Sequence, residues 1–256
     1  MNKLFLTLAF VAAFVARAKA QEKVVTLDSY FNNEHRKTAD GAVQSFHYKW
    51  EEKDNNGFSI FGEIFKNNGA RLQTLYEEPT LNKLKKTTVY IIVDPDTKKE
   101  SPDPKYISQA DANVIAQWVK AGGTLLLFAN DSANVELPNF NKLAEKFGMH
   151  FNNQMINHVT DDQHFADGAV IPVNNPVFKT AAKIFMKDAC SITVKKPAEA
   201  LLYSGSAVII AEANFGKGKV VAVGDPWLYN EYVNGRLPAG FDNDKAAADL
   251  VKWLMK

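Results

Sequence analysis

Acidic and amide side chains follow four apolar runs of the 256-residue sequence. Carboxylates can exchange protons and accept hydrogen bonds from hydroxyl groups, and a pair of carboxylates is the usual machinery for cleaving a glycosidic bond. His47 is a possible base, although a packed and hydrogen-bonded histidine is an equal alternative. The candidate catalytic residues are Asp28, Glu34, His47, Asp94, Asp131, Asp225 and Glu231.

Further side chains beside these acids are of the types that bind sugars. Amides match sugar hydroxyls, and the rings of Trp and Tyr can cover the apolar face of a pyranose. The candidate substrate-binding residues are Asn32, Asn33, Trp50, Asp96, Asn130, Asn134, Trp227, Tyr229 and Asn230. Asp and Asn are also common after strands, because they start turns and cap helices. The prediction of a site therefore depends on all four groups lying together.

Other possible sites in the sequence have weaker support. His158, Asp161, Asp162 and His164 have a spacing that a metal could use, but no H-E-x-x-H or cysteine pattern accompanies them. Cys190 has no glycine-rich elbow around it, so we expect a buried structural thiol. The sequence thus predicts neither a metal site nor a cofactor.

The elements that must position the polar groups alternate between strand and helix patterns. The predicted strands are residues 24–27, 71–75, 88–93, 124–128, 207–211 and 219–223. The predicted helices are residues 58–65, 108–120, 139–147 and 242–253. Repeated strand–helix order with continuous apolar strands predicts an α/β fold, with a mainly parallel sheet covered by helices on both faces. The carboxyl ends of such strands form one edge, and ligands bind there.

The sequence also predicts features of the second half of the chain and the number of domains. Gly216-Lys217-Gly218 predicts a tight turn that joins the last two strands as a hairpin at the sheet edge. Asp242 is expected to cap the final helix. Residues 150–200 are less regular and contain short strand-like runs, so we expect a β-rich elaboration there. No linker divides the chain, which predicts one domain over residues 21–256.

The first twenty residues have the pattern of a secretory signal peptide. Lys3 precedes an apolar stretch from Leu4 to Val15, and Ala18-Lys19-Ala20 is a cleavage site of the A-x-A type. A helix of that apolar stretch would be about 18 Å long, which is too short for a hydrocarbon core of about 30 Å. We therefore expect a periplasmic or secreted protein that has no membrane partner after the signal is removed.

The charge of the remaining chain is close to neutral. Removal of the signal takes away three basic residues and no acid, and leaves 27 basic and 29 acidic residues. A basic face for nucleic acid does not follow from this balance, so we expect no nucleic-acid partner.

Several longer motifs resemble a known family. The motifs lie at 27–34, 46–50, 57–59, 62–65, 90–97, 118–119 with 122–123, 129–131 with 134, 216–218 and 224–232. They resemble the uncharacterised domain attached to unsaturated rhamnogalacturonyl hydrolases of pectin-degrading Bacteroidetes, over nearly all of the chain after the signal. That domain is similar to the class I glutamine amidotransferase-like fold, a flavodoxin-like three-layer sandwich that includes trehalose-utilisation proteins.

The resemblance implies a role in pectin or rhamnogalacturonan breakdown, with an oligosaccharide ligand. It does not imply glutamine hydrolysis, because the turn at Ala129-Asn130-Asp131-Ser132 has no cysteine nucleophile. One hypothesis is a glycoside hydrolase that acts through carboxylates at the strand ends. The alternative is a non-catalytic sugar-binding domain that supports a separate glycoside hydrolase. An enzyme should place two carboxylates in a deep pocket, whereas a binding module should show a shallow, aromatic-lined groove.

Overall fold

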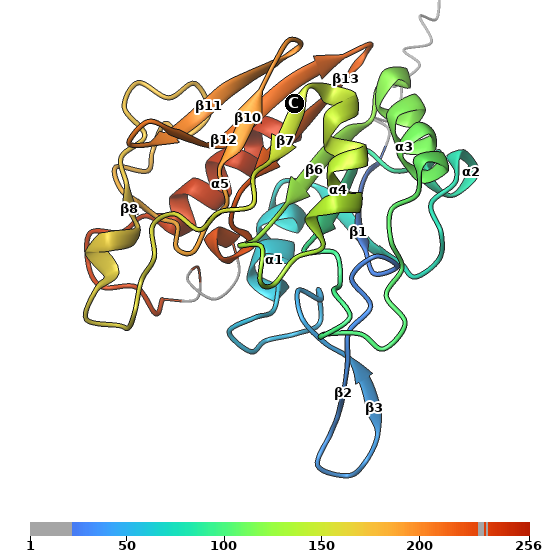
Figure 1. Ribbon diagram of the computed structural model, residues 1–256, viewed down its shortest axis with the longest axis horizontal. Coiled ribbons are helices and arrows are strands. Elements are labelled where there is room, and N and C mark those ends of the chain that lie inside the picture. Colours follow the sequence, from blue (N-terminus) through green and yellow to red (C-terminus); the bar gives the residue numbers. More distant parts are fainter. Residues whose placement is uncertain (1–21, 230–232, 234) are drawn as a thin grey trace, which may run out of the picture.

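A seven-stranded sheet forms the centre of the computed structural model, which describes residues 22–229, 233 and 235–256 (Figure 1). In spatial order its strands are β11 (Ala198–Ser204), β12 (Ala207–Phe215), β13 (Gly218–Val223), β6 (Thr124–Phe128), β5 (Val89–Val93), β1 (Lys23–Asp28) and β4 (Ala70–Leu75). Neighbouring strands are parallel from β13 to β4, whereas β11, β12 and β13 pair antiparallel. The expected α/β class with a mainly parallel sheet is confirmed.

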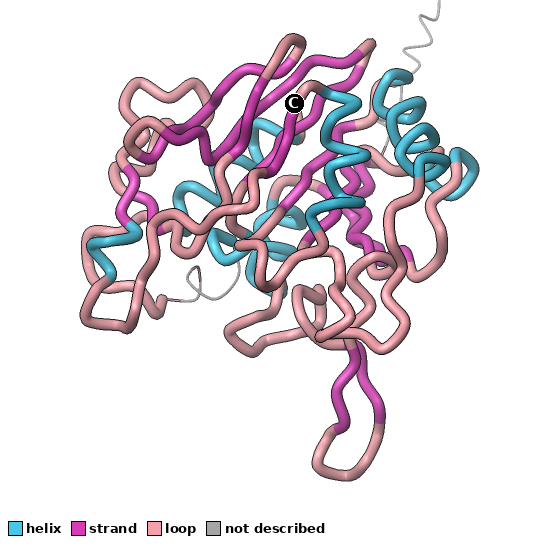
Figure 2. Tube along the Cα trace, viewed as in Figure 1, coloured by secondary structure: helices cyan, strands magenta, loops and turns pink. Residues whose placement is uncertain are grey.

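Helices cover both faces of this sheet, as expected (Figures 1 and 2). The helices are α1 (Ser59–Asn67) and α5 (Asn243–Leu254) on one face, and α2 (Leu81–Leu84), α3 (Gln109–Ala121) and α4 (Leu137–Ala144) on the other. Strand β5 shows the physical reason. Ile91 faces the core beneath α1 and α5, while Tyr90 and Ile92 face the core beneath α3 and α4. Because side chains alternate along a strand, a continuous apolar run fits a strand that is buried on both faces.

The helix boundaries follow from capping residues. Ser108 and Asp111 form a capping box at the start of α3, and Gly122, at φ 129°, follows its end. The predicted helix at 139–147 begins earlier, at Leu137, because the Glu136 side chain accepts a hydrogen bond from the Asn139 backbone N–H. It continues as a 3₁₀ turn, η1 (Glu145–Phe147).

Two predictions for the C-terminal part need correction. The hairpin around residues 216–218 is present, but it does not lie at the sheet edge, because β11 adds a further strand beyond β12. Asp242 occupies the N-cap position of α5 without capping it. Its carboxylate instead accepts a hydrogen bond from the Ala182 N–H and pairs with Lys245.

Short strands outside the main sheet form three antiparallel pairs. Strands β2 (His35–Lys37) and β3 (Val43–Ser45) form a hairpin that projects from the body; we call residues 35–45 the arm (Figure 1). The sequence did not predict the arm. The expected elaboration contains β7 (Met149–Phe151) paired with β10 (Ile192–Val194), and β8 (Ala169–Val170) paired with β9 (Ile184–Phe185). Two further 3₁₀ turns are η2 (Phe165–Gly168) and η3 (Pro226–Tyr229). Within the described ranges, no helix has the length and apolar character needed to cross a membrane.

The strand order identifies one special place at the carboxyl edge. From β1 the chain passes through α1 to β4 on one side, and later places β5 on the other side of β1 and moves outward through α3 to β6. The direction of strand addition therefore reverses between β1 and β5. In open α/β sheets, ligands bind in the crevice outside the strand ends at such a reversal.

Candidate functional site

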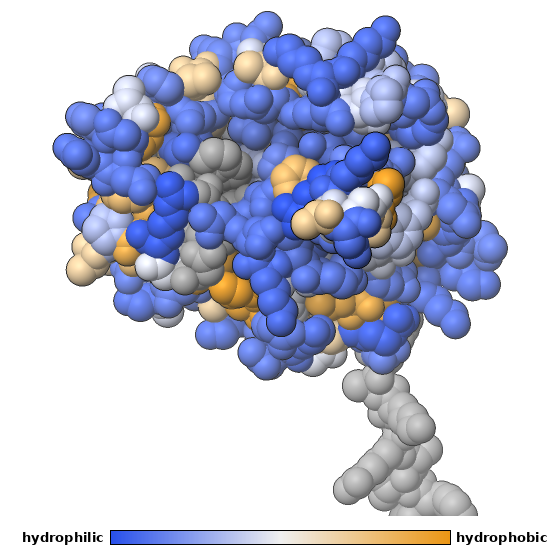
Figure 3. Space-filling view, turned by 90° about the horizontal axis from the view of Figure 1, so that it is seen from below, coloured by the Kyte–Doolittle hydropathy of each residue, from blue (hydrophilic) through white to orange (hydrophobic). Residues whose placement is uncertain are grey.

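The four polar groups lie along one edge of the sheet, as the sequence predicted. Asp28, Asp94, Asn130 and Asp225 follow or end β1, β5, β6 and β13, and these four strands are adjacent and parallel. Figure 3 views the molecule from this side and shows a surface of mainly hydrophilic residues. The groups differ, however, in what their side chains contact.

Eight ionisable side chains interact at the carboxyl ends of β1 and β5, which is the place where the strand order reverses. We call them the switch-point cluster: Asp28, Glu34, His47, Lys49, Glu52, Asp94, Asp96 and Glu100. Four of them were predicted to be catalytic and Asp96 to bind substrate. Lys49, Glu52 and Glu100 were missed.

Asp28 shapes the turn that follows β1. Its Oδ1 accepts hydrogen bonds from the N–H groups of Phe31, at 2.7 Å, and Tyr30, at 3.2 Å. Its Oδ2 accepts one from the Tyr90 hydroxyl at 2.5 Å. Burial raises the pKa of Asp28 to about 6 in spite of these bonds. This carboxyl is fully buried, so its contacts fit a turn residue better than a group that meets a substrate.

Lys49 connects the segment after β1 to the segment before α1. Its Nζ donates hydrogen bonds to both the backbone oxygen and the Oδ1 of Asn32, each at 2.7 Å. The Asn32 amide in turn donates to the backbone oxygen of Asp94 at 3.1 Å. Burial lowers the pKa of Lys49 to about 8, although the carboxylates of Asp28 and Asp96 act in the opposite direction. A lysine between the aromatic residues of the 46–50 segment was the sequence signal for this role.

Asp94 and Asp96 are buried carboxyls with incomplete hydrogen bonding. Asp96 accepts the Asn33 N–H on Oδ2 at 2.9 Å, but its Oδ1, like the Oδ1 of Asp94, has no partner among the described residues. Burial raises the pKa of Asp96 to about 7, and burial together with Glu100 raises the pKa of Asp94 well above its ordinary value. These two side chains therefore hold protons more readily than ordinary aspartates do.

Glu34 and His47 form the part of the cluster that reaches the surface. His47 Nδ1 lies 2.7 Å from Glu34 Oε1, and the two side chains are 22% and 12% exposed. His47 and Tyr48 have φ angles of 66° and 56°, and Asp94 has 47°, all in the left-handed region. Non-glycine residues adopt that conformation at a cost, and such strain concentrates at functional sites.

Two open cavities flank the arm beside this cluster. The basic cavity, of about 400 Å³, lies between the arm and the 100–105 loop and is lined by Asn33, His35, Arg36, Lys37, Glu100 and Lys105, among others. The Glu52 cavity, of about 460 Å³, lies on the other side and is lined by Arg36, Lys49, Glu52 and Tyr76, among others. A larger cavity of about 580 Å³ is at the opposite end of the sheet, beside Lys23 and Trp118, and does not involve the acidic groups.

The predicted residues after β6 and β13 serve local structure. Asp131 accepts hydrogen bonds from the Ala133 N–H at 2.9 Å and the Asn134 amide at 2.7 Å, and its own N–H donates to Asn130 Oδ1. Asp225 accepts the Lys187 N–H at 2.8 Å. Both carboxylates are buried. These bonds match the alternative interpretation, in which Asp and Asn after strands stabilise turns.

Two aromatic residues predicted to stack on sugar lie in the hydrophobic core. Trp50 donates its Nε1–H to the Gln73 backbone oxygen at 3.1 Å, and the buried Tyr229 ring stacks on Phe61 at 5.0 Å. Neither ring is placed to cover a ligand at the carboxyl edge of the sheet. The Trp227 side chain, Asn230 and Glu231 lie outside the described residues.

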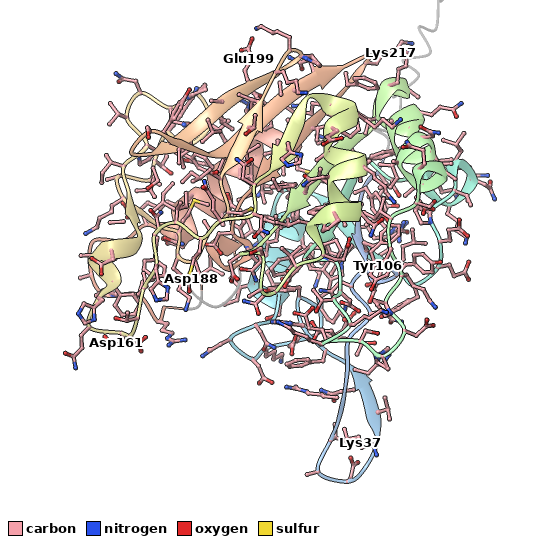
Figure 4. All side chains as sticks on the ribbon, in the orientation of Figure 1. Lys37, Tyr106, Asp161, Asp188, Glu199 and Lys217 are labelled. Carbon is pink, nitrogen blue, oxygen red and sulfur yellow. The ribbon has the colours of Figure 1, made fainter. Side chains whose placement is uncertain are left out.

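The remaining predictions concern metal and thiol chemistry. In the parts of the chain that the structure describes, no three His, Cys, Asp or Glu side chains are grouped to hold a metal ion. His164 pairs with Asp161, on a loop far from the arm that carries Lys37 (Figure 4). Cys190 is buried, and burial raises the pKa of its thiol, as a structural cysteine requires.

Comparison with known proteins gives a family and a fold. The family model described as "Domain of unknown function (DUF4350)" matches residues 51–235. No curated protein matches the chain. The chain is similar to the solved "mmIFT52 N-terminal domain", with 19% identity, a TM-score of 0.67, and coverage of 91% of this chain and 97% of that one.

Two further structures are more distantly similar. One is a cytoplasmic protein from Salmonella typhimurium LT2, with 14% identity, a TM-score of 0.51, and coverage of 79% and 87% of the two chains. The other is the β-galactosidase of Rahnella sp. R3, with 15% identity and a TM-score of 0.53. The matched region covers 92% of this chain but 31% of the galactosidase chain. At these identities the likeness shows the fold alone.

Proposed function

The chain belongs to the DUF4350 family, whose description gives no activity, and we propose that it is an exported carbohydrate-active hydrolase of pectin-type oligosaccharides with its site at the switch-point cluster. The observation that carries the proposal is the Glu34–His47 pair. Glu34 Oε1 lies 2.7 Å from His47 Nδ1, and the pair reaches the surface beside the carboxyl of Glu100. This pair lies where the strand order supports a ligand crevice.

The proposed chemistry uses two carboxyls with different proton affinities. Burial and the neighbouring Glu34 raise the pKa of Glu100, which favours a protonated group that can donate to a leaving oxygen. Glu34, oriented by His47, is the matching carboxylate that accepts a proton from water or attacks the sugar.

The basic cavity supports an acidic sugar as the ligand. Arg36, Lys37 and Lys105 contribute positive charge to its lining, and Asn33 contributes an amide. Asp103 also lines this cavity and pairs with Lys105, and Arg36 pairs with Asp54, so Lys37 is the lining lysine that has no carboxylate partner among the described residues. A guanidinium or ammonium group attracts the carboxylate of a uronic acid, and an amide matches its hydroxyls. Glu100 lines the same cavity, which brings the proposed acid next to the proposed sugar-binding groups.

The sequence resemblance supports the biological setting of the proposal. The domain attached to unsaturated rhamnogalacturonyl hydrolases and the signal-like residues 1–20 favour a periplasmic or secreted protein of pectin breakdown. The strand order of the five parallel strands favours the flavodoxin-like group, in which the second strand lies outside the first.

A second candidate function is non-catalytic sugar binding in support of a separate glycoside hydrolase. It is favoured by the hydrogen bonds of Asp28, Asp131 and Asp225, which occupy these acids in turns, and by the open form of both cavities. In this function the basic cavity would hold the same ligand without bond cleavage.

One experiment separates the two candidates. Purified protein is incubated with rhamnogalacturonan-derived unsaturated oligosaccharides, and products are separated by chromatography. We expect turnover that falls by about 100-fold or more in Glu34→Gln and in Glu100→Gln. The matched control is Glu63→Gln, since Glu63 is an exposed acid on α1 that pairs only with Lys66 in the described structure.

The other outcomes each change the conclusion. Saturable binding by calorimetry without turnover supports the accessory function. If turnover falls by about 100-fold in Asp225→Asn while Glu34→Gln retains its activity, the catalytic site lies at the end of β13 instead. If the protein shows no turnover and no binding, the proposal is wrong.

A further inference from the structure

The Glu52 carboxylate is buried without a hydrogen bond. Its side chain is 6% exposed, and neither oxygen has a hydrogen-bond partner in the described part of the chain. The nearest cation is Arg36, whose Nη2 lies 3.9 Å from Glu52 Oε1, too far for a hydrogen bond. Arg36 bonds to Asp54 at 2.8 Å instead, and its guanidinium lies over the Phe46 ring. A buried carboxyl in this state is costly unless something supplies donors.

Backbone contacts hold Glu52 in place beside the Glu52 cavity. The Glu52 N–H donates to the Lys49 oxygen at 3.2 Å, and its own oxygen accepts the Ser59 N–H at 3.3 Å. Gly57 packs so closely that a Cβ there would lie 2.0 Å from the Glu52 oxygen. Glu52 is one of the residues that line the cavity of about 460 Å³, and a ligand that enters it must displace the side chains that cover the two carboxylate oxygens. A fixed acceptor needs little ordering when a ligand binds.

The lining of this cavity is balanced in charge and includes one exposed ring. Its charged residues are Arg36, Lys49, Lys53, Glu51, Glu52 and Asp54. Three cations and three anions give no net attraction for an anion, whereas the basic cavity has three cations and two acids, Glu100 and Asp103. Tyr76, which is 55% exposed, contributes an aromatic ring to the lining. A neutral sugar unit offers hydroxyl groups that can donate hydrogen bonds to Glu52. It also offers an apolar face that can stack on the Tyr76 ring.

We propose that the Glu52 cavity is a subsite for a neutral sugar unit, in which Glu52 accepts hydrogen bonds from two hydroxyls and Tyr76 covers the apolar face. The assignment of the ligand to carbohydrates rests on the proposed function. Lys49 and Arg36 connect this subsite to the switch-point cluster and to the basic cavity. An oligosaccharide that crosses the base of the arm can thus place an acidic unit in the basic cavity and a neutral unit at Glu52.

Calorimetric binding of two probes tests the subsite. The first probe is a rhamnogalacturonan tetrasaccharide, in which neutral rhamnose and galacturonic acid alternate; the second is tetragalacturonate, which has acidic units only. We expect Glu52→Gln to weaken binding of the first probe about tenfold or more and Tyr76→Ala to weaken it several-fold. Binding of tetragalacturonate should change less than twofold in both variants. Glu63→Gln is the control, and thermal unfolding verifies that each variant folds.

The outcomes distinguish this subsite from the proposed function. If wild-type protein binds the first probe and both variants bind it equally well, the subsite is wrong and the proposed function stands. Equal weakening of both probes by Glu52→Gln would also overturn the assignment to a neutral unit. If the wild-type protein binds neither probe, the proposed function is wrong and the subsite falls with it.

Discussion

Lys49 is buried among carboxyls, and its two hydrogen bonds to Asn32 hold together the segments that carry Glu34 and His47. Replacement by Met keeps most of the volume but leaves the Asn32 oxygens and the nearby acids without this cation. We expect Lys49→Met to lower the free energy of unfolding by about 3 kcal/mol at pH 7, measured by chemical denaturation. Lys53→Met, at an exposed position, is the control. A loss below about 0.5 kcal/mol would mean that Lys49 does not support the cluster.

Asp96 should make stability fall as the pH rises toward neutral. Burial raises its pKa from 3.8 to about 7, so the folded state binds more protons than the unfolded state between pH 4 and pH 7. Its stabilising contribution is complete below about pH 4 and is lost as the pH rises through 7. The nearly isosteric Asp96→Asn cannot ionise, so we expect its decline in unfolding free energy over this range to be smaller by about 2 kcal/mol. Denaturation at several pH values measures this, and parallel curves would contradict it.

The candidate site was predictable from sequence only in part, because residue type does not reveal hydrogen-bond partners. Asp28 and Asp131 follow strands in the same way as Asp94, yet turns occupy the first two, whereas Asp94 keeps an unpartnered oxygen. Lys49 was missed because its partner is Asn32, 17 residues earlier in the chain, through both the backbone oxygen and Oδ1, and sequence does not reveal a pairing at that separation. Glu52 was missed because its burial depends on the close packing of Gly57.

The long buried strands and amphipathic helices were predictable because each carries its own periodic pattern. Strands β5 and β6 and the capping box of α3 are examples. Strands β2 and β3 have three residues each, too few for a pattern, and exist through pairing with one another. The hairpin was placed wrongly at the edge because β11 was not recognised, and β11 contains charged and exposed positions.

The arm should matter for ligand binding far more than for stability. No residue from 35 to 45 belongs to the described hydrophobic clusters, whereas Arg36 lines both cavities. Replacing residues 36–44 with a Gly-Ser linker should change the free energy of unfolding by less than about 1 kcal/mol. The same change should abolish calorimetric binding of the rhamnogalacturonan tetrasaccharide.

A shorter replacement gives the control for the arm. Changing only residues 39–41 at the tip leaves Arg36 and Lys37 in place and should retain binding. Unchanged binding after the full replacement would show that the arm does not form a wall of the ligand site.

For the molecule as a whole, the two cores depend on a strand that comes late in the chain. β13 lies between β6 and β12, and its residues contribute to the hydrophobic clusters on both faces, with Val221 on one side and Val220 on the other. A chain that ends at residue 217 should therefore lack cooperative unfolding, measured by calorimetry. A sharp transition near that of the full chain would show that the four parallel strands β1, β4, β5 and β6 fold without it.

The same pairing has a consequence for synthesis. Lys219 pairs with Thr124, so the edge of β6 must wait for a partner that is 95 residues further along the chain. At a translation rate of 5–20 residues per second, that wait lasts roughly 5–20 s. During this interval the nascent chain presents the apolar, unpaired edge of Thr124–Phe128 to its surroundings. An unpaired strand edge is a template for aggregation, so production of this protein should depend on chaperones that hold incomplete chains.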